Sequence, residues 1–130
     1  MNFCRIEHIN KVCQNLETTL QFYKILFPDW FVRAREESDN LSWVHFGNHR
    51  FYISLYGRRD ASKSIPLNTG NIDHIGFVIE DGKKMMAVLE ANRVEYFVED
   101  SPETKYRIYV TDPDNTGLEL VEYNEDYELR

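Results

Sequence analysis

A short phrase occurs twice in this chain and constrains its fold more than any other feature. It reads Arg5-Ile6-Glu7-His8-Ile9-Asn10 near the N-terminus and Asn71-Ile72-Asp73-His74-Ile75-Gly76 farther along, so that the two histidines are 66 positions apart. A helix-like stretch follows each copy. A repeated strand that carries one histidine predicts a duplicated module, with two imidazoles at a common site. Imidazoles are frequent ligands of zinc, iron and nickel.

The residues after each copy predict the same order of elements. In the first half, a strand at residues 3–12 precedes a helix that is capped by Asn15 and ended by Pro28, and three strands follow, at residues 30–36, 41–46 and 50–56. In the second half, a strand at residues 72–79 precedes a helix between Asp81 and Asn92, and three strands follow, at residues 94–98, 105–111 and 118–123.

The predicted fold class is therefore α+β, with two tandem βαβββ modules. We expect one domain over residues 1–130, with repeat halves at 1–57 and 71–124 and a polar linker at 58–70. The charged tail after Asn124 is expected to be loosely ordered.

The composition of the chain limits the kinds of partner that the protein is expected to bind. Hydrophobic residues make up 42% of the chain and aromatic residues 14%, enough for a buried core. The net charge of −7, from 15 basic and 22 acidic residues, disfavours nucleic acid and anionic membranes as partners. Cys4 and Cys13 lie too close together for a convincing disulfide, and we find neither a signal peptide nor a membrane span. We therefore expect reduced thiols in a cytoplasmic protein.

Strand alternation assigns side chains to the two faces of each sheet. Ile75, Phe77 and Ile79 are expected to face the helix, which turns His74 to the other, inner face. The same parity turns Glu119 inward in the last strand. In the first half it turns His8 and Ser54 inward. Four repeat-equivalent inner positions follow: His8, Ser54, His74 and Glu119.

Each of these residues also has an ordinary structural interpretation. A histidine in a half-buried strand is often a hydrogen-bonded core residue, and Glu119 could be an outward residue of an alternating strand. The conjunction of two histidines and one carboxylate favours a metal site instead. An inward carboxylate needs a cation or strong donors, and an ion held by two imidazoles and one carboxylate satisfies all three groups.

The chain resembles the vicinal oxygen chelate superfamily, which includes glyoxalase I, methylmalonyl-CoA epimerase, fosfomycin resistance enzymes, extradiol dioxygenases and bleomycin-binding proteins. The resemblance covers essentially the whole chain. It rests on four segments, namely Ile6-Glu7-His8-Ile9, the helix phrase 16–23 with its Phe22-Tyr23 pair, Asp73-His74-Ile75, and Asp112-Pro113-Asp114 leading into Gly117-Leu118-Glu119-Leu120.

That resemblance implies paired βαβββ modules that curl around a cavity, in a glyoxalase-like fold with a divalent ion. It implies metal ligands at His8, His74 and Glu119, with Ser54 at a possible fourth position. Glyoxalase I and the epimerases place Glu or Gln there. The extradiol dioxygenases and the thiol-transferring fosfomycin enzymes use His, His and Glu, which is closer to this chain.

Other residues are candidates for the substrate pocket. Asn10 could bond a substrate oxygen or make a local strand-end bond, and Tyr52 and Tyr56 could line the pocket or simply pack. We do not assign His45 to the site, because Val44 and Phe46 compete with it for the buried face. His49 falls in a predicted turn and is expected to be exposed.

The sequence thus predicts a metalloenzyme of lyase, dioxygenase or thiol-transferase type, acting on a small oxygenated molecule. The cofactor would be one divalent ion per site: zinc, nickel, manganese or iron. The alternative is a non-enzymatic binder of the bleomycin-resistance type. We also predict a homodimer, with the metal site either inside one chain or shared between two.

Overall fold

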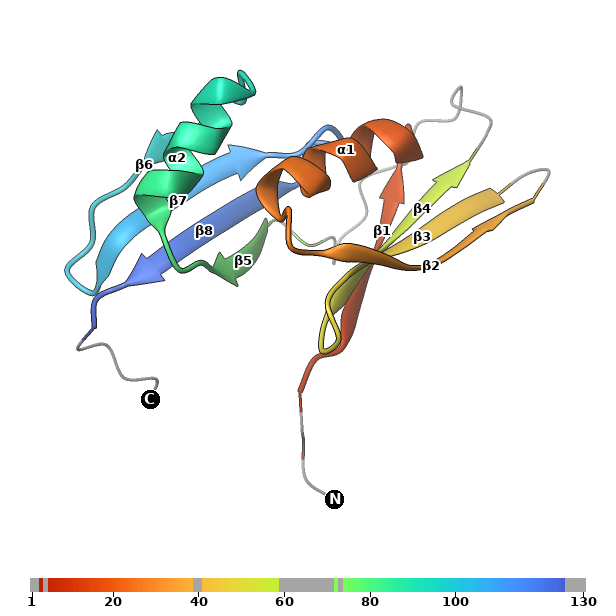
Figure 1. The fold of residues 1–130 in the computed structure, drawn as a ribbon, viewed down its shortest axis with the longest axis horizontal. Coiled ribbons are helices and arrows are strands. Elements are labelled where there is room, and N and C mark those ends of the chain that lie inside the picture. The colour runs from red at the N-terminus through yellow and green to blue at the C-terminus, as the bar shows by residue number, and fades with distance from the viewer. Residues whose placement is uncertain (1–2, 4, 39–40, 59–71, 73, 126–130) are drawn as a thin grey trace. The chain divides into compact units, whose positions relative to one another are not determined.

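A computed structural model describes residues 3, 5–38, 41–58, 72 and 74–125. The chain divides into two compact units, Met1–Pro66 and Leu67–Arg130, called here the first and second modules. Each has the predicted βαβββ order of elements (Figure 1). The predicted linker 58–70 lies outside the described residues, apart from Arg58, which ends a strand of the first module. Of the predicted loose tail, only Glu125 is described.

The first module contains a four-stranded mixed sheet and one helix. Along the chain its elements are β1 (His8–Cys13), α1 (Leu16–Leu26), β2 (Phe31–Glu37), β3 (Leu41–Gly47) and β4 (Tyr52–Arg58). The spatial order is β1-β4-β3-β2, with β1 parallel to β4 and the other pairs antiparallel. The parallel pair places residues from the two ends of the module side by side.

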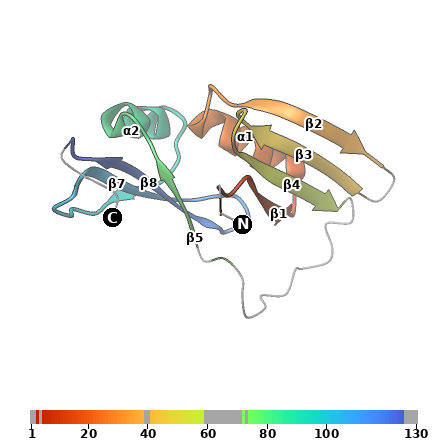
Figure 2. The same ribbon diagram turned by 90° about the horizontal axis from the view of Figure 1, so that it is seen from below.

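The second module repeats this topology. Its elements are β5 (His74–Val78), α2 (Gly82–Ala91), β6 (Phe97–Val98), β7 (Thr104–Thr111) and β8 (Gly117–Tyr123). The spatial order is β5-β8-β7-β6, again with a parallel first pair, and α2 packs on β7 and β8 (Figure 2). Neither sheet is closed into a barrel.

Both helices begin where the sequence predicts. The side chain of Asn15 accepts a hydrogen bond from the backbone N–H of Thr18 at 3.0 Å, and Asp81 does the same for Lys84 at 3.0 Å. α1 stops at Leu26, two residues before Pro28, because proline disfavours helical geometry in the residue ahead of it. Among the described residues, neither helix is long and apolar enough to cross a membrane.

The strand ends differ from the predicted ranges, and for three strands hydrogen bonding gives the reason. β1 starts at His8 rather than residue 3, because its partner β4 offers no residue before Tyr52 in the ladder. β4 itself starts late because the Asn48 side chain accepts from the N–H groups of Arg50 and Phe51 and holds them in a turn. β6 keeps only two residues of the range 94–98, since the N–H of Val94 bonds back to Leu89 in the helix.

Each module buries its own core between helix and sheet. In the first module the core comprises Leu16, Leu20, Tyr23, Leu26, Val44, Phe46, Ile53 and Leu55. In the second it comprises Ile75, Met85, Leu89, Ile108, Val110, Leu118 and Leu120, whereas the buried Val121 lies on the other face of β8. Within the strands the buried positions mostly alternate, so the residues between them lie on the sheet face opposite the helix, which we call the open face.

Candidate metal and substrate site

Two of the predicted ligands meet on the open face of the second module. His74 pairs in register with Gly117 and Gly76 with Glu119, which makes His74 and Glu119 diagonal neighbours across the parallel β5–β8 pair. The His74 Nε2 atom lies 3.5 Å from Glu119 Oε2. Two ligand atoms about 2.1 Å from one ion, at a near-tetrahedral angle, stand roughly 3.4 Å apart. The pair therefore fits adjacent positions on a single divalent ion.

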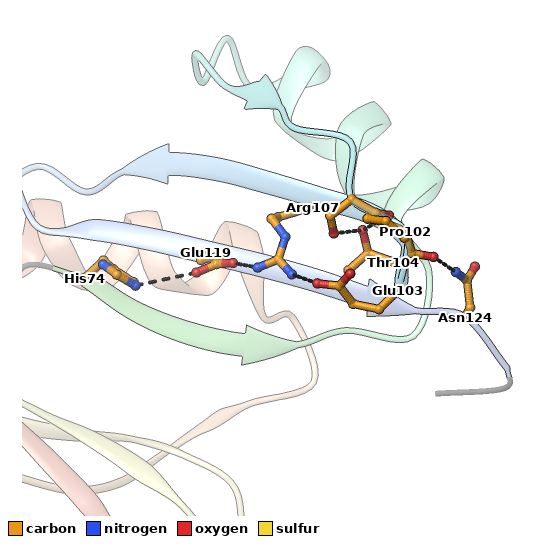
Figure 3. Close-up of polar contacts among 8 residues, drawn as sticks. His74, Pro102, Glu103, Thr104, Arg107, Glu119 and Asn124 are labelled. Atoms are coloured by element: carbon orange, nitrogen blue, oxygen red, sulfur yellow. Dashed lines mark hydrogen bonds and ion pairs between the residues drawn. The ribbon is translucent and has the colours of Figure 1, made fainter. Parts of the chain in front are cut away.

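The other oxygen of Glu119 is held by an arginine that the sequence analysis did not identify. The Arg107 Nη1 group donates to Glu119 Oε1, and its Nη2 group donates to Glu103 Oε1 at 3.2 Å. The four side chains form a line from His74 through Glu119 and Arg107 to Glu103 (Figure 3). Glu119 thus faces the imidazole with one oxygen and the guanidinium with the other.

The guanidinium of Arg107 compensates the charge of the inward Glu119 carboxylate. The Glu119 side chain is 13% exposed and that of Arg107 is 16% exposed, so their attraction is little screened by water. The strong donor that Glu119 requires is therefore present within the second module. Arg107 could have been found only from strand register. It lies two residues from Tyr109, and Tyr109 is the residue opposite Glu119 in β7.

The turn before β8 fixes where Glu119 falls in the strand. The buried side chain of Asp112 accepts from the N–H groups of Asp114 and Thr116, each at 2.9 Å. Asn115 adopts a left-handed φ of 67°, which asparagine tolerates better than most residues. The Asp-Pro-Asp phrase noted in the sequence is thus the turn that joins β7 to β8, and β8 begins two residues before Glu119.

The β5 residue beside the Glu119 carboxylate has no side chain. Gly76 is the β5 residue opposite Glu119, and a Cβ atom on Gly76 would meet no described heavy atom within 4 Å. The equivalent position of the first module carries Asn10. The open face of the second module therefore has room next to Glu119 for a group that the chain does not itself supply.

His8 has a partner for one of its two ring nitrogens. Its Nδ1 atom lies 2.9 Å from Glu7 Oε1, and this hydrogen bond lowers the pKa of Glu7. With the Nδ1 proton held by Glu7, the lone pair of Nε2 is available to a metal, an arrangement common among metal-binding histidines. The acid that precedes histidine in the repeated phrase was visible in the sequence, although its role was not.

Ser54 occupies the place in the first module that Glu119 occupies in the second. It lies opposite Asn10 in β1 and opposite His45 in β3, as Glu119 lies opposite Gly76 and Tyr109. Ser54 is buried, although its side chain points to the open face. A short hydroxyl therefore stands where the other module presents a carboxylate.

The structure places His45 on this open face, although the sequence analysis did not assign it to the site. Val44 and Phe46 are buried against α1, as expected, and strand alternation turns His45 away from them. Its ring stacks on Tyr52 with centroids 4.5 Å apart, and Tyr52 in turn stacks on His8 at 4.8 Å. Burial, followed by the charges of His8 and Arg33, lowers the pKa of His45.

The ring row is the main feature of the open face of the first module, and we define it as His8, Tyr52, His45 and Trp43. The last contact, between His45 and Trp43, has a centroid distance of 4.6 Å. The guanidinium of Arg33 lies 4.5 Å from the centroid of the Tyr52 ring. Tyr52 is therefore both a predicted pocket residue and the centre of this row.

The remaining candidates differ in their surroundings. Asn10 is exposed beside Ser54, and Tyr56 is half-buried between Val12 and Trp43 in the strand register. His49 is exposed in its turn, as expected, and its ring lies 5.1 Å from that of Phe31. Within either module, the described residues contain no group of three histidine, cysteine, aspartate or glutamate side chains able to hold an ion. His8 as a third ligand therefore stays a prediction.

Known structures share the fold of this chain. A glyoxylase/bleomycin resistance protein/dioxygenase domain from Frankia sp. EAN1pec aligns with 95% of this chain and 100% of its own, at 17% identity and a TM-score of 0.77. The chain has the glyoxalase-like fold. The predicted resemblance to the vicinal oxygen chelate superfamily is thereby confirmed at the level of the fold.

Two further structures with the glyoxalase-like fold carry names that bear on chemistry. Glyoxalase I of Leishmania major aligns with 92% of this chain and 87% of its own, at 21% identity and a TM-score of 0.74. The fosfomycin resistance protein FosX of Listeria monocytogenes, complexed with Mn(II) and sulfate, aligns with 96% of this chain and 97% of its own, at 21% identity and a TM-score of 0.71. No protein-family profile and no curated protein sequence matches the chain.

Proposed function

We propose that this protein is a metal-dependent enzyme of the vicinal oxygen chelate class, with His8, His74 and Glu119 as ligands of one divalent ion. The observation that carries the proposal is the 3.5 Å separation of His74 Nε2 and Glu119 Oε2, which suits two ligands of one ion. The Mn(II) complex of FosX, a protein of the same fold, supports a divalent transition ion as the cofactor class.

The protein's own residues would hold and orient a small oxygenated substrate. When bound, the ion would supply Lewis acidity to two adjacent substrate oxygens. Ser54 contributes no charged ligand, so the site would keep positions open for those oxygens. Asn10, Tyr52 and Tyr56 are the proposed pocket residues, and His45 joins them because its ring stacks on Tyr52. The reaction would be of lyase, dioxygenase or thiol-transferase type.

A non-enzymatic binding protein is the second candidate, and one observation favours it. Arg107 already compensates the charge of Glu119, so that the second module needs no metal ion to satisfy its carboxylate. In that case the ring row of the first module would be the main surface for a small ligand, with Arg33 at Tyr52 as a fixed charge.

Metal titration separates the two candidates. Calorimetry near neutral pH should show uptake of zinc, nickel, manganese or ferrous ion by the wild-type protein, and His74→Ala should remove most of it. Glu119→Gln should weaken binding, whereas His49→Ala, a substitution at the exposed turn, should leave it unchanged. Binding should fall as the pH drops through the histidine range, because protons compete for the imidazoles. A folded protein that takes up none of these ions would favour the binding protein.

The assembly and the substrate need separate measurements. We propose a cytoplasmic homodimer, and light scattering that gives a monomer with stoichiometric metal would exclude a site shared between chains. Assays of the metal-loaded protein with 2-oxoaldehyde–thiol adducts, catechols and fosfomycin would distinguish the three reaction types.

A further inference from the structure

The line from His74 to Glu103 contains two residues, Arg107 and Glu103, for which the proposed metal site provides no role. Arg107 lies between two carboxylates and occupies only the Oε1 atom of Glu119, so that Oε2 is the oxygen presented to His74 (Figure 3). The Glu119 and Arg107 side chains are largely buried, at 13% and 16% exposure. A planar guanidinium fixes the orientation of a carboxylate better than an ammonium group does.

Glu103 balances the charge that Arg107 brings to this site. A lone guanidinium next to a metal ligand would repel an incoming cation, whereas the paired Glu103 offsets that charge. Glu103 is itself held in place, because its backbone C=O accepts from the N–H of Asn124 at 3.0 Å. The Asn124 side chain donates to the C=O of Pro102 at 2.9 Å, which fixes the same turn.

Comparison with the first module supports a specific link between the Glu119 carboxylate and Arg107. In the strand registers, Arg107 lies opposite Val121 and Trp43 lies opposite Tyr56, which makes Trp43 the equivalent of Arg107. The module that lacks the carboxylate at Ser54 thus also lacks the arginine. The two groups occur together in the second module and neither occurs at the equivalent positions of the first.

We propose that Arg107 is a positioning residue that holds Glu119 for one-oxygen binding of a divalent cation together with His74. This inference rests on the proposed metal site. It adds that the arginine, rather than the ion, sets the orientation of the carboxylate, and that Glu103 keeps the guanidinium from opposing the cation.

The test compares Arg107→Met with Arg35→Met in titrations with zinc and manganese. Arg35 is a matched control, since it also donates to two carboxylates, Glu17 and Glu37, neither of which is a proposed metal ligand. Arg107→Met should weaken binding about 10–100-fold, the usual cost of losing a group that supports a metal ligand. Arg35→Met should leave the dissociation constant unchanged.

Two further measurements separate positioning from a general effect on folding. Arg107→Lys keeps the charge but cannot serve both carboxylates in one plane, so its affinity should fall between those of wild type and Arg107→Met. If Arg107→Met does not fold, Arg107→Lys is the test variant in its place. The visible absorption of bound Co²⁺ should weaken in Arg107→Met, because a released carboxylate can bind through both oxygens and raise the coordination number.

The outcomes distinguish this inference from the proposed function. Wild-type uptake with unchanged or tighter binding by the Arg107 variants would overturn the positioning role alone. A folded wild-type protein without uptake of any of the ions would overturn both. Weaker binding by the Arg107 variants, with an unchanged Arg35 control, would support the inference.

Discussion

The two modules share a fold but differ in the chemistry of their open faces. The open face of the first module carries aromatic and imidazole rings, and the hydroxyl of Ser54 lies between Asn10 of β1 and His45 of β3. The second carries a carboxylate at the equivalent position, held between His74 and Arg107. The buried helix-facing positions of both modules are mostly apolar, with Lys11 and Thr19 as polar exceptions in the first. Duplication of the core therefore fixes the fold, while the open face of each copy is free to acquire its own polar groups.

The substitutions with the largest expected effect on unfolding free energy test whether the two modules unfold together. Phe46→Ala and Leu120→Ala each remove a fully buried side chain, from the first and second module, at an expected cost of about 3–5 kcal/mol in unfolding free energy. Both tryptophans, Trp30 and Trp43, lie in the first module, so fluorescence reports on that module while far-ultraviolet circular dichroism reports on both.

If the chain is a single domain, Leu120→Ala should shift both the fluorescence and the dichroism transitions in urea, since a unit of about 60 residues has only marginal stability by itself. A dichroism transition that moves while the fluorescence transition stays in place would instead make the modules independent.

The next effect comes from giving the first module the carboxylate of the second. Ser54→Glu should destabilise the metal-free protein by roughly 3 kcal/mol, because Trp43 rather than an arginine stands at the position that compensates Glu119. The same substitution should tighten metal binding, since it adds a charged oxygen ligand. Urea unfolding with chelator and calorimetry with zinc measure the two effects. Ser54→Ala is the control, and a large loss of metal binding there would mean that the hydroxyl itself matters.

A smaller effect concerns the turns that precede the last strand of each module. Asp112→Ala should cost about 1–3 kcal/mol, because it leaves the N–H groups of Asp114 and Thr116 without their acceptor in a part-buried turn. Asn48→Ala should cost less, about 0.5–1.5 kcal/mol, because its turn is exposed and water can replace the lost acceptor. Equal costs in thermal unfolding would show that burial of the turn does not matter.

The smallest effect is a pH dependence in the first module. Burial lowers the pKa of His45 in the folded state, so the unfolded chain binds more protons near pH 6. The stability that neutral His45 contributes is present above its unfolded pKa of about 6.5 and is lost as the pH falls through the lower folded value. His45→Gln should therefore lose less stability than wild type between pH 7.5 and pH 5.5, measured by urea unfolding with chelator. His49→Gln should behave like wild type.

Much of the fold was predictable because local signals agreed with the repeat. Asn15 and Asp81 were identified as helix caps, and alternation placed His74 and Glu119 on the face away from the helix. Strand ends were predicted less well, because they depend on the partner strand. The apolar residues Phe3 and Ile6 suggest a longer β1, yet they are exposed, since β4 offers them no backbone partner.

The candidate site was predicted only in part, and two of its residues were not assigned to it from the sequence. Arg107 and His45 belong to the site because β7 and β3 pair with the strands that carry Glu119 and Ser54. The register of each pair is set by the turn between the two strands and by the alternation of apolar residues, and the predicted range of a strand does not by itself give that register. The carboxylate and its need for compensation could therefore be predicted from the sequence, whereas the arginine that provides the compensation could not.

The sequence by itself determined the duplication, the order βαβββ in each half and the residues that each helix covers. The duplication follows from the repeated phrase, and the elements of each half follow from periodicity and capping, which act over a few neighbouring residues. Only the tertiary structure decided that the acid at 119 faces His74 with one oxygen and Arg107 with the other, and that His45 joins the ring row. Such contacts join side chains on different strands, and only strand pairing brings those side chains within a few ångströms of one another.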